Sequence, residues 1–433
     1  MDFTSGRLIE CDGSASPAVG RGTAGVARSV FNFTTLVVGG GLLGWPNSFK
    51  MCGWLGGVCC LFVCCLFSET TMCLLVNLGI KCGTFSYEET CSAIWGRGGY
   101  YVITITCYLM DFGVLVTYWV ALGDLVAPLA HEAFGTSDRT RIKLGLAAIM
   151  LGPSYLRNLG KIPGWSLANY GLIIFGSVSM LCMVFLPATA DFARDHIEPI
   201  GESISPGFGE AVKVGMWPSL GTLAFTFCNH DSVFMIFSNL KDGTWQRWAL
   251  TCKLAMWPVV LLMILTGLPM YFVLGEKVAS DITTSFPNTG FMLAVRGALT
   301  VSVAMTWIYL QQVARKYLHS LVMPLLLRRA LTPSESYNLT VPELLCFTTF
   351  QFSVTLVLGI STEDLGLPMA LTGVFAMSLA AFIIPPCLLL TSVLRGDDVG
   401  YGRVAQAYFC MVLLFGLTSC TLGAESTLSA RYD

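Results

Sequence analysis

The stretch VVGGGLLGWPNSF, from Val37 to Phe49, interrupts an apolar segment that is otherwise suited to cross a membrane. Gly is the poorest ordinary helix former and Pro lacks a backbone N–H donor, so four glycines and Pro46 predict unwound backbone. At membrane depth such backbone is tolerated only where protein buries it or where it lines a water-filled cavity. The sequence therefore predicts a broken first membrane helix, and the break is a candidate binding site.

The composition places the chain among polytopic membrane proteins. Of 433 residues, 54% are hydrophobic and 12% are charged, whereas soluble domains contain about 25% charged residues. A net charge of -2 disfavours nucleic acid as a partner. The 17 cysteines are scattered through apolar runs such as VCCLFVCCLF (58–67), so we interpret them as small hydrophobic residues rather than as a disulfide framework or a metal site.

Residues 1–25 are polar and rich in Gly and Ser, and we expect a disordered cytosolic tail. They lack the pattern of a removable signal peptide. Apolar stretches long enough to approach the 17–25 residues of a span occur eleven times. They are Val26–Phe49, Leu55–Leu78, Tyr100–Leu129, Ile142–Leu156, Trp165–Ala188, Val214–Leu240, Leu250–Leu274, Phe291–Leu318, Leu344–Ile360, Leu367–Leu390 and Val404–Leu422.

The distribution of positive charge predicts the orientation of these spans. With the N-terminus in the cytosol, sixteen of the 25 Lys and Arg residues fall on the cytosolic side, as the positive-inside rule requires. Between the second and third spans, SYEETCSAIWG (86–96) predicts a short interfacial helix, with Ser86 as its cap and Glu89 completing a capping box.

A second interruption falls in the sixth span. Asn229, His230 and Asp231 are consecutive in an apolar segment and Ser232 follows. Three successive polar residues cannot all face one packed neighbour, so they predict unwound backbone lining a cavity. The alternative is that His230 and Asp231 satisfy each other within a packed core.

The two breaks occupy corresponding positions in two groups of five spans, which is the sequence pattern of an inverted-repeat transporter with a site at mid-membrane. The expected fold is all-α, with about eleven transmembrane helices in a 5+5 inverted repeat plus one extra helix. The expected divisions are the tail 1–25, a first repeat 26–190, an extracytosolic loop 191–213, a second repeat 214–391, and an eleventh helix with a short tail 392–433.

Broken helices offer binding groups for a zwitterion. Helix N-termini expose N–H groups and C-termini expose carbonyls, so Gly39–Gly41 suit a carboxylate and carbonyls near Phe227 and Cys228 suit an ammonium group. Close helix packing is the alternative role for the glycines. The candidate substrate-binding residues are Val38, Gly39, Gly40, Gly41, Leu42, Phe227, Cys228, Asn229, Asp111 and Thr117.

Four stretches resemble the amino acid/auxin permease family, in particular its sodium-coupled neutral amino acid transporters. They are SVFNFTTLVVGGGLLGWPNSFKMCGW (29–54), FTFCNHDSVFMIFSNLKD (225–242), GEKVASDITTSFP (275–287) and QVARKYL (312–318). The resemblance implies a LeuT-type core of ten helices plus an eleventh, working by alternating access.

The same resemblance implies a sodium site formed by backbone near Val37 or Gly40 and by hydroxyls of Ser302 and Thr306. Thr35 stands where relatives often have an Asn ligand, which leaves sodium and proton coupling both open. The candidate ion-coupling residues are Thr35, Val37, Ser302, Thr306, Asp111 and His230. No other metal and no cofactor is expected.

Asp111 is the clearest charged residue inside a span, where a carboxylate costs roughly 2.5–3.5 kcal/mol. It could carry a proton, pair with a cationic substrate, or bind His230; alternatively it lies near an interface or is capped by Tyr108 and Tyr118. Gly113 and Thr117 follow on nearby faces, so the third helix is expected to border the pocket.

These features favour a secondary active symporter for neutral amino acids. A membrane amino acid sensor and a transporter of cationic amino acids are the alternatives. No catalytic motif is visible, which disfavours an enzyme. We expect a multi-pass protein of the plasma membrane or of a lysosome- or vacuole-type membrane, with a small-molecule substrate, lipid as surroundings, and a monomer as a plausible state.

Overall fold

The computed structural model describes residues 22–38, 40–157, 165–185, 211–213, 215–327 and 339–429. This part of the chain is a bundle of α-helices, and an isolated β-bridge joins Ala24 to Leu240. Helices suit a bilayer because each satisfies its own backbone polar groups without water. Seven helical stretches within the described residues are long and apolar enough to cross a membrane: Trp54–Cys82, Tyr87–Phe134, Trp245–Lys277, Gly290–Leu327, Val341–Ser361, Gly366–Leu394 and Arg403–Ser429.

The remaining predicted spans correspond to shorter or interrupted helices. The first span is α1 (Val26–Val38), the turn η1 (Gly40–Leu43) and α2 (Trp45–Cys52). The sixth is α9 (Met216–Phe227), the turn η3 (His230–Ser232) and α10 (Val233–Asn239). The fourth and fifth are α5 (Arg139–Ser154) and α6 (Trp165–Phe185). The other elements are α3 (Trp54–Cys82), α4 (Tyr87–Phe134), α11 (Trp245–Leu274), η4 (Gly275–Lys277), η5 (Ile282–Ser285), α12 (Gly290–Leu327), α14 (Val341–Ser361), α15 (Gly366–Thr372), η6 (Gly373–Met377), η7 (Leu379–Ile383), α16 (Ile384–Leu394) and α17 (Arg403–Ser429).

The interfacial helix predicted at 86–96 is the start of α4. Its cap is present, because the Ser86 hydroxyl accepts a hydrogen bond from the backbone N–H of Glu89 at 3.1 Å. Gly96, with φ 70° and ψ -157°, is the non-helical residue that separates this segment from the rest of α4. A left-handed φ favours Gly, so the kink falls where the sequence permits it. Residues 1–21 and 191–210 lie outside the described part of the chain.

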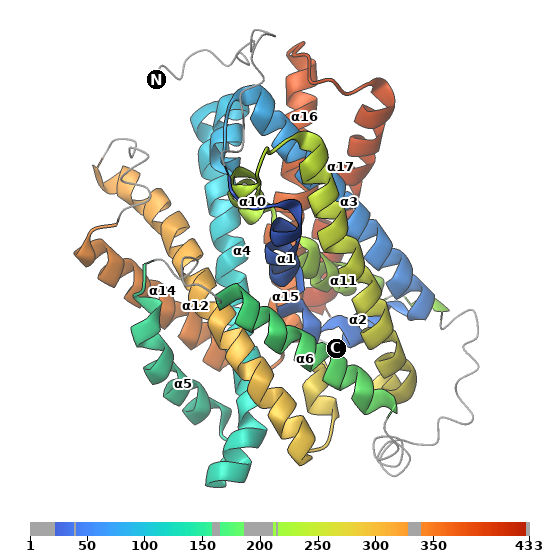
Figure 1. Ribbon diagram of the computed structural model, residues 1–433, viewed down its shortest axis with the longest axis vertical. Helices are drawn as coiled ribbons and strands as arrows, with labels where there is room; N and C mark the ends of the chain where they lie inside the picture. Colours follow the sequence, from blue (N-terminus) through green and yellow to red (C-terminus); the bar gives the residue numbers. More distant parts are fainter. Residues whose placement is uncertain are drawn as a thin grey trace.

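The first broken helix lies in the middle of the bundle. Figure 1 shows α1 surrounded by longer helices, and it packs against α11, α6, α10 and α9. α12 runs along α4, and α14 covers the same pair. The second broken helix crosses η6 closely, because a Cβ on Gly373 would lie 1.7 Å from the carbonyl oxygen of Gly221. Small residues thus allow the backbones of α9 and η6 to touch.

The two ends of the bundle are held together differently. At the near end, where α1 begins, the Ala24 backbone bonds to Asn239 and Lys241 at the end of α10. At the far end, Lys50 of α2 donates to the Val278 carbonyl at 2.9 Å, which places the segment between α11 and α12 over α2. Both broken helices therefore run from one end of the bundle to the other.

Candidate functional site

The first helix break confirms the prediction from the Gly-rich stretch. α1 ends at Val38, Gly40–Leu43 form a 3-10 turn, and α2 starts at Trp45 with Pro46 in its first turn. Pro is tolerated there because first-turn N–H groups have no acceptor within the helix. Gly39 lies outside the described residues.

Gly41 lies where the first break contacts α9. A Cβ at Gly41 would lie 2.4 Å from Thr226 Oγ1 and 2.9 Å from Trp45 Nε1. Those two groups are themselves hydrogen bonded, with the Trp45 indole donating to the Thr226 hydroxyl at 3.3 Å. Any side chain at position 41 would therefore displace the contact between the two broken helices.

The second break is also present. α9 ends at Phe227, and Cys228 is extended, with φ -88° and ψ 101°. The turn at His230–Ser232 follows and leads into α10. Because the last turn of a helix has carbonyls without helical donors, the end of α9 carries a partial negative charge.

A cavity lies between the two breaks, α4 and α12. Asp231 lines it, as the polar run at 229–231 predicted, and so do Ser232 and Tyr309, which the sequence had not placed there. Tyr309 gives no sequence signal, because an aromatic residue in an apolar span is ordinary. Six of the predicted site residues also line the cavity: Val37, Gly41, Asp111, Cys228, Asn229 and Thr306.

Other predicted residues lie outside the cavity lining. Val38 and Phe227 are in the packed core. The Thr117 hydroxyl donates to the Gly113 carbonyl at 2.8 Å, and the Thr35 hydroxyl donates to the Phe31 carbonyl at 3.0 Å. Both threonines thus use their own helix as acceptor. Gly40 and Leu42 are described only as backbone of the 3-10 turn.

Two carboxylates face the cavity. The Asp111 side chain is 1% exposed, and its Oδ2 atom has no hydrogen-bond partner. Asp231 accepts a hydrogen bond from the Ser232 hydroxyl at 3.1 Å. Among the described residues that line the cavity there is no Lys, Arg or His. The cavity wall therefore carries acidic groups without a basic counterpart.

His230 does not bind Asp111, which was one of the expectations from the sequence. Its Nε2 atom is 2.9 Å from the Thr71 hydroxyl, and its Nδ1 atom is 3.6 Å from Cys228 Sγ. It is fully buried and is not among the residues lining the cavity. Nε2 thus ties the break to α3 and Nδ1 contacts a residue of the break itself, so the pairing of His230 with Asp231 is also absent.

The two hydroxyls expected at a sodium site are joined by an amide. Asn169 of α6 accepts from the Ser302 hydroxyl at 2.6 Å and donates to the Thr306 hydroxyl at 3.0 Å. The Thr306 hydroxyl donates in turn to the Ser302 carbonyl at 2.9 Å. Asn169 was missed from the sequence, because a single polar residue in a span does not indicate its partner.

Comparison with known families decides the class of the protein. The model of the family described as transmembrane amino acid transporter protein matches residues 22–427. The chain belongs to this transporter family. This family is the amino acid/auxin permease family, as the resemblance predicted, and it consists of transporters rather than enzymes.

Several curated relatives match most of the length of this transporter. "Putative sodium-coupled neutral amino acid transporter 11" of Danio rerio is 22% identical, over 93% of this chain and 89% of the relative. Amino acid transporter AVT1D of Arabidopsis thaliana is 25% identical, over 93% of this chain and 69% of the relative. Vacuolar amino acid transporter 2 of Saccharomyces cerevisiae is 21% identical, over 83% of this chain and 75% of the relative.

A solved structure supports the fold of the transporter. The crystal structure of a manganese transporter of Eremococcus coleocola superposes with a TM-score of 0.54 over 94% of this chain and 88% of the other. The two chains are 13% identical, so the likeness concerns the fold alone.

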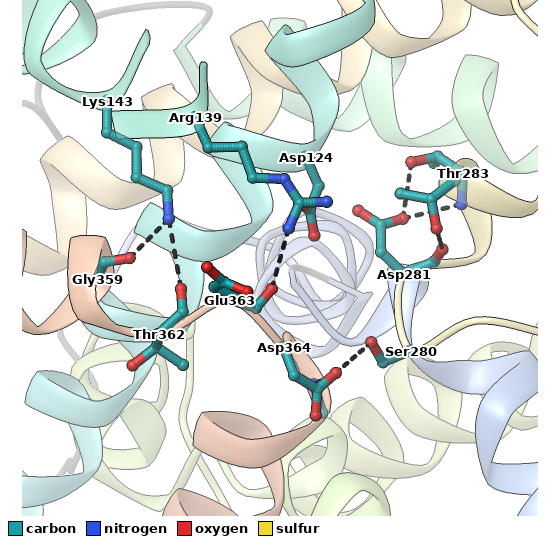
Figure 2. Close-up of polar contacts among 12 residues, drawn as sticks. Asp124, Arg139, Lys143, Ser280, Asp281, Thr283, Gly359, Thr362, Glu363 and Asp364 are labelled. Atoms are coloured by element: carbon teal, nitrogen blue, oxygen red, sulfur yellow. Dashed lines mark hydrogen bonds and ion pairs between the residues drawn. The ribbon is translucent and has the colours of Figure 1, made fainter. Parts of the chain in front are cut away.

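Polar contacts close the far end of the transporter above the cavity. Figure 2 shows Lys143 of α5 donating to the carbonyls of Gly359 and Thr362 at the end of α14, at 2.6 and 3.4 Å. Arg139 pairs with buried Asp124 at 2.9 Å. These contacts join three helices that enclose the far end.

The segment between α11 and α12 lies over the same end. The Ser280 hydroxyl donates to Asp364 at 2.5 Å (Figure 2), and Lys213 forms an ion pair with Glu276. Asp281 is buried and accepts from the Thr283 hydroxyl at 2.7 Å. Burial raises the pKa of the Asp281 carboxyl from 3.8 to about 6, while the hydrogen bonds from Thr283 act in the opposite direction.

Proposed function

We propose that this chain is a secondary active symporter that carries neutral amino acids by alternating access. The observation that carries the proposal is that two interrupted helices meet at one cavity, which is lined by residues of both breaks, two carboxylates and apolar side chains. For a zwitterion, the carbonyl ends of α1 and α9 and the carboxylate of Asp231 suit the ammonium group, and backbone N–H groups of the glycine-rich first break suit the carboxylate. The apolar residues suit an uncharged side chain.

The repeat supports alternating access. α1, η1 and α2 begin the first group of five spans, and α9, η3 and α10 begin the second, so we infer a 5+5 inverted repeat followed by α17 as an eleventh span. In such folds, the two halves move around a fixed mid-membrane site. The contacts of Lys143, Arg139 and Ser280 at the far end are consistent with a state closed on that side.

Further parts of the proposal come from the sequence and the relatives. Neutral substrates are proposed because most of the residues that line the cavity are apolar and one relative is named for neutral amino acids. We place the N-terminus in the cytosol, following the distribution of Lys and Arg. The membrane is proposed to be the plasma membrane or a lysosome- or vacuole-type membrane, and one relative is named as vacuolar.

Transport into vesicles tests this function. The full chain is purified, reconstituted into proteoliposomes, and supplied with each of the twenty radiolabelled amino acids, with sodium and pH gradients imposed separately. We expect one or more neutral amino acids to accumulate above the external concentration when a gradient is present. Empty liposomes treated in parallel provide the control for leakage.

A sensor would give a different result in the same experiment. Saturable binding of an amino acid to the detergent-purified protein, together with no uptake under any gradient, would replace the transporter proposal by the sensor alternative. Accumulation of lysine and arginine with no uptake of neutral amino acids would overturn the substrate class alone.

A further inference from the structure

The place expected for a coupling sodium ion is filled by a side chain of α6. Na⁺ would bind Ser302 and Thr306 through hydroxyl lone pairs, as a hard cation binds oxygen. In the structure, an amide N–H of Asn169 points at the Thr306 hydroxyl, 3.0 Å away. This N–H uses one of the two lone pairs of the Thr306 oxygen, and a cation would compete with it there because both carry positive charge to the oxygen.

The two hydroxyl protons of this cluster are also hydrogen bonded. Ser302 gives its proton to the Asn169 carbonyl oxygen, and Thr306 gives its proton to the Ser302 carbonyl. Asn169 is 6% exposed and Ser302 is 4% exposed, so the bond between them is shielded from water, whereas Thr306 is half-buried and lines the cavity. Both hydroxyl protons and one amide N–H of the cluster therefore have acceptors without an ion.

A carboxylate of the same cavity, Asp111, requires a cationic partner. Asp111 is 1% exposed, has an oxygen without a hydrogen bond, and belongs to a cavity whose described lining holds a second carboxylate and no basic residue. An isolated charge in the interior costs several kcal/mol, so such groups are neutralised or paired. A proton is the smallest cation that removes this cost.

We propose that this transporter is driven by protons, that Asp111 is the side chain that binds the coupling proton, and that Asn169 occupies the place of a sodium ion. The inference rests on the proposed symport function. Asp231 is more exposed than Asp111 and accepts a hydrogen bond from the Ser232 hydroxyl, and its carboxylate binds the ammonium group of the substrate. The titratable side chains around Asp111 are Asp231, Cys107, Cys228, Tyr118, Tyr309 and Tyr317.

The arrangement explains how a proton and a substrate become coupled. With both carboxylates ionised, the cavity wall holds two like charges that repel each other, and one ammonium group neutralises only one of them. A proton taken from water by Asp111 removes the second charge, so the cavity closes best when both the proton and the substrate are bound. Ligands that favour the same state bind cooperatively.

Transport by proteoliposomes with Asp111→Asn tests the proton site. Asn imitates the protonated acid, so exchange of labelled for unlabelled amino acid should continue at neutral pH. Accumulation driven by a pH gradient should be lost, whereas in the unmodified protein it should reach about tenfold per pH unit for one proton carried per substrate, since one pH unit is about 1.4 kcal/mol. Asp242→Asn is the matched control, because Asp242 is exposed and remote from the cavity.

Binding of sodium is tested by thermal unfolding, without a transport measurement. The thermal unfolding midpoint of the purified protein should be equal in sodium chloride and in choline chloride. Asn169→Asp removes the donor and adds a carboxylate, so that variant should be stabilised by sodium relative to choline. Stabilisation of the unmodified protein by sodium, or uptake driven by a sodium gradient without a pH gradient, would overturn the inference.

The outcomes separate this inference from the proposed function. If exchange occurs but Asp111→Asn accumulates substrate under a pH gradient as the unmodified protein does, the proton site is wrong and the transporter remains. If neither exchange nor accumulation of any amino acid occurs, the transport function fails and the inference fails with it.

Discussion

At the scale of single residues, the site depends on positions where a side chain would be harmful. Gly41 is the strongest case, since a Cβ there would lie within 3 Å of both Thr226 and Trp45. We expect Gly41→Ala to reduce uptake roughly 5- to 150-fold, because inserting atoms into a packed site costs about 1–3 kcal/mol. Initial rates in proteoliposomes measure this effect.

Gly25→Ala is the matched control for that substitution, because a Cβ at Gly25 meets nothing within 4 Å. It should transport at the rate of the unmodified protein. The thermal unfolding midpoints of the two variants show whether each variant is folded under the conditions of the transport measurement. Unchanged uptake by folded Gly41→Ala would remove the contact between the breaks from the mechanism.

Asp281 gives a prediction of pH dependence outside the spans. Its pKa is about 6 in the folded protein against 3.8 for an ordinary aspartate. The folded state therefore binds more protons between these values, and stability falls as the pH rises through this range. Since one pKa unit is about 1.4 kcal/mol, the ionised form costs on the order of 3 kcal/mol above pH 6.

Asp281→Asn should therefore raise the thermal unfolding midpoint at pH 7.5 and flatten its change between pH 4 and pH 7. The Asn carbonyl oxygen can still accept both hydrogen bonds from Thr283. Asp242→Asn, at an exposed carboxylate, should leave the pH profile unchanged. A lower midpoint for Asp281→Asn at pH 7.5 would show that Asp281 stabilises the fold as an anion.

At the scale of helices, Lys143 of α5 acts as the cap of α14. α14 has no basic residue in its last turn, and Lys143, 2% exposed, supplies donors to its Gly359 and Thr362 carbonyls. We expect Lys143→Met to lower the free energy of unfolding by about 1.5–3 kcal/mol. Met has about the same side-chain volume as Lys but cannot donate the charged hydrogen bonds to the two carbonyls. Lys253→Met, at an exposed lysine of α11, is the control. Equal unfolding midpoints for the two variants would show that the cap is dispensable.

The sequence predicted helix breaks better than it predicted helix partners. A helix break arises locally, from the backbone freedom of glycine, the missing N–H of Pro46 or a run of polar residues such as that at Asn229. Each of these signals can be seen within a single segment of the sequence. Asn169 and Lys143 act through residues more than a hundred positions away, and nothing in their own segments indicates those partners. The π-helical turns at Gly373–Ile383 likewise follow from packing against α9 and α17. Fold class was therefore predictable, while the amide that joins Ser302 and Thr306 was not.

At the scale of the whole molecule, alternating access requires the far end to open. The segment between α11 and α12 covers that end and is fixed to α2 by Lys50 and to the α14–α15 connection by the bond from Ser280 to Asp364. A covalent link at this second contact should therefore hold the transporter closed on one side, while leaving the substrate cavity itself unchanged.

The variant with both Ser280→Cys and Asp364→Cys, treated with a short thiol cross-linker, should lose uptake and exchange and recover both after reduction. Each single cysteine variant, treated in the same way, controls for modification of the native cysteines and should retain uptake. Binding of substrate to the cross-linked protein from the near end should persist, because only the far end is fixed. Mass spectrometry shows whether the cross-link has formed. Full uptake by the cross-linked protein would contradict this prediction, because substrate would then cross the membrane although the far end cannot open.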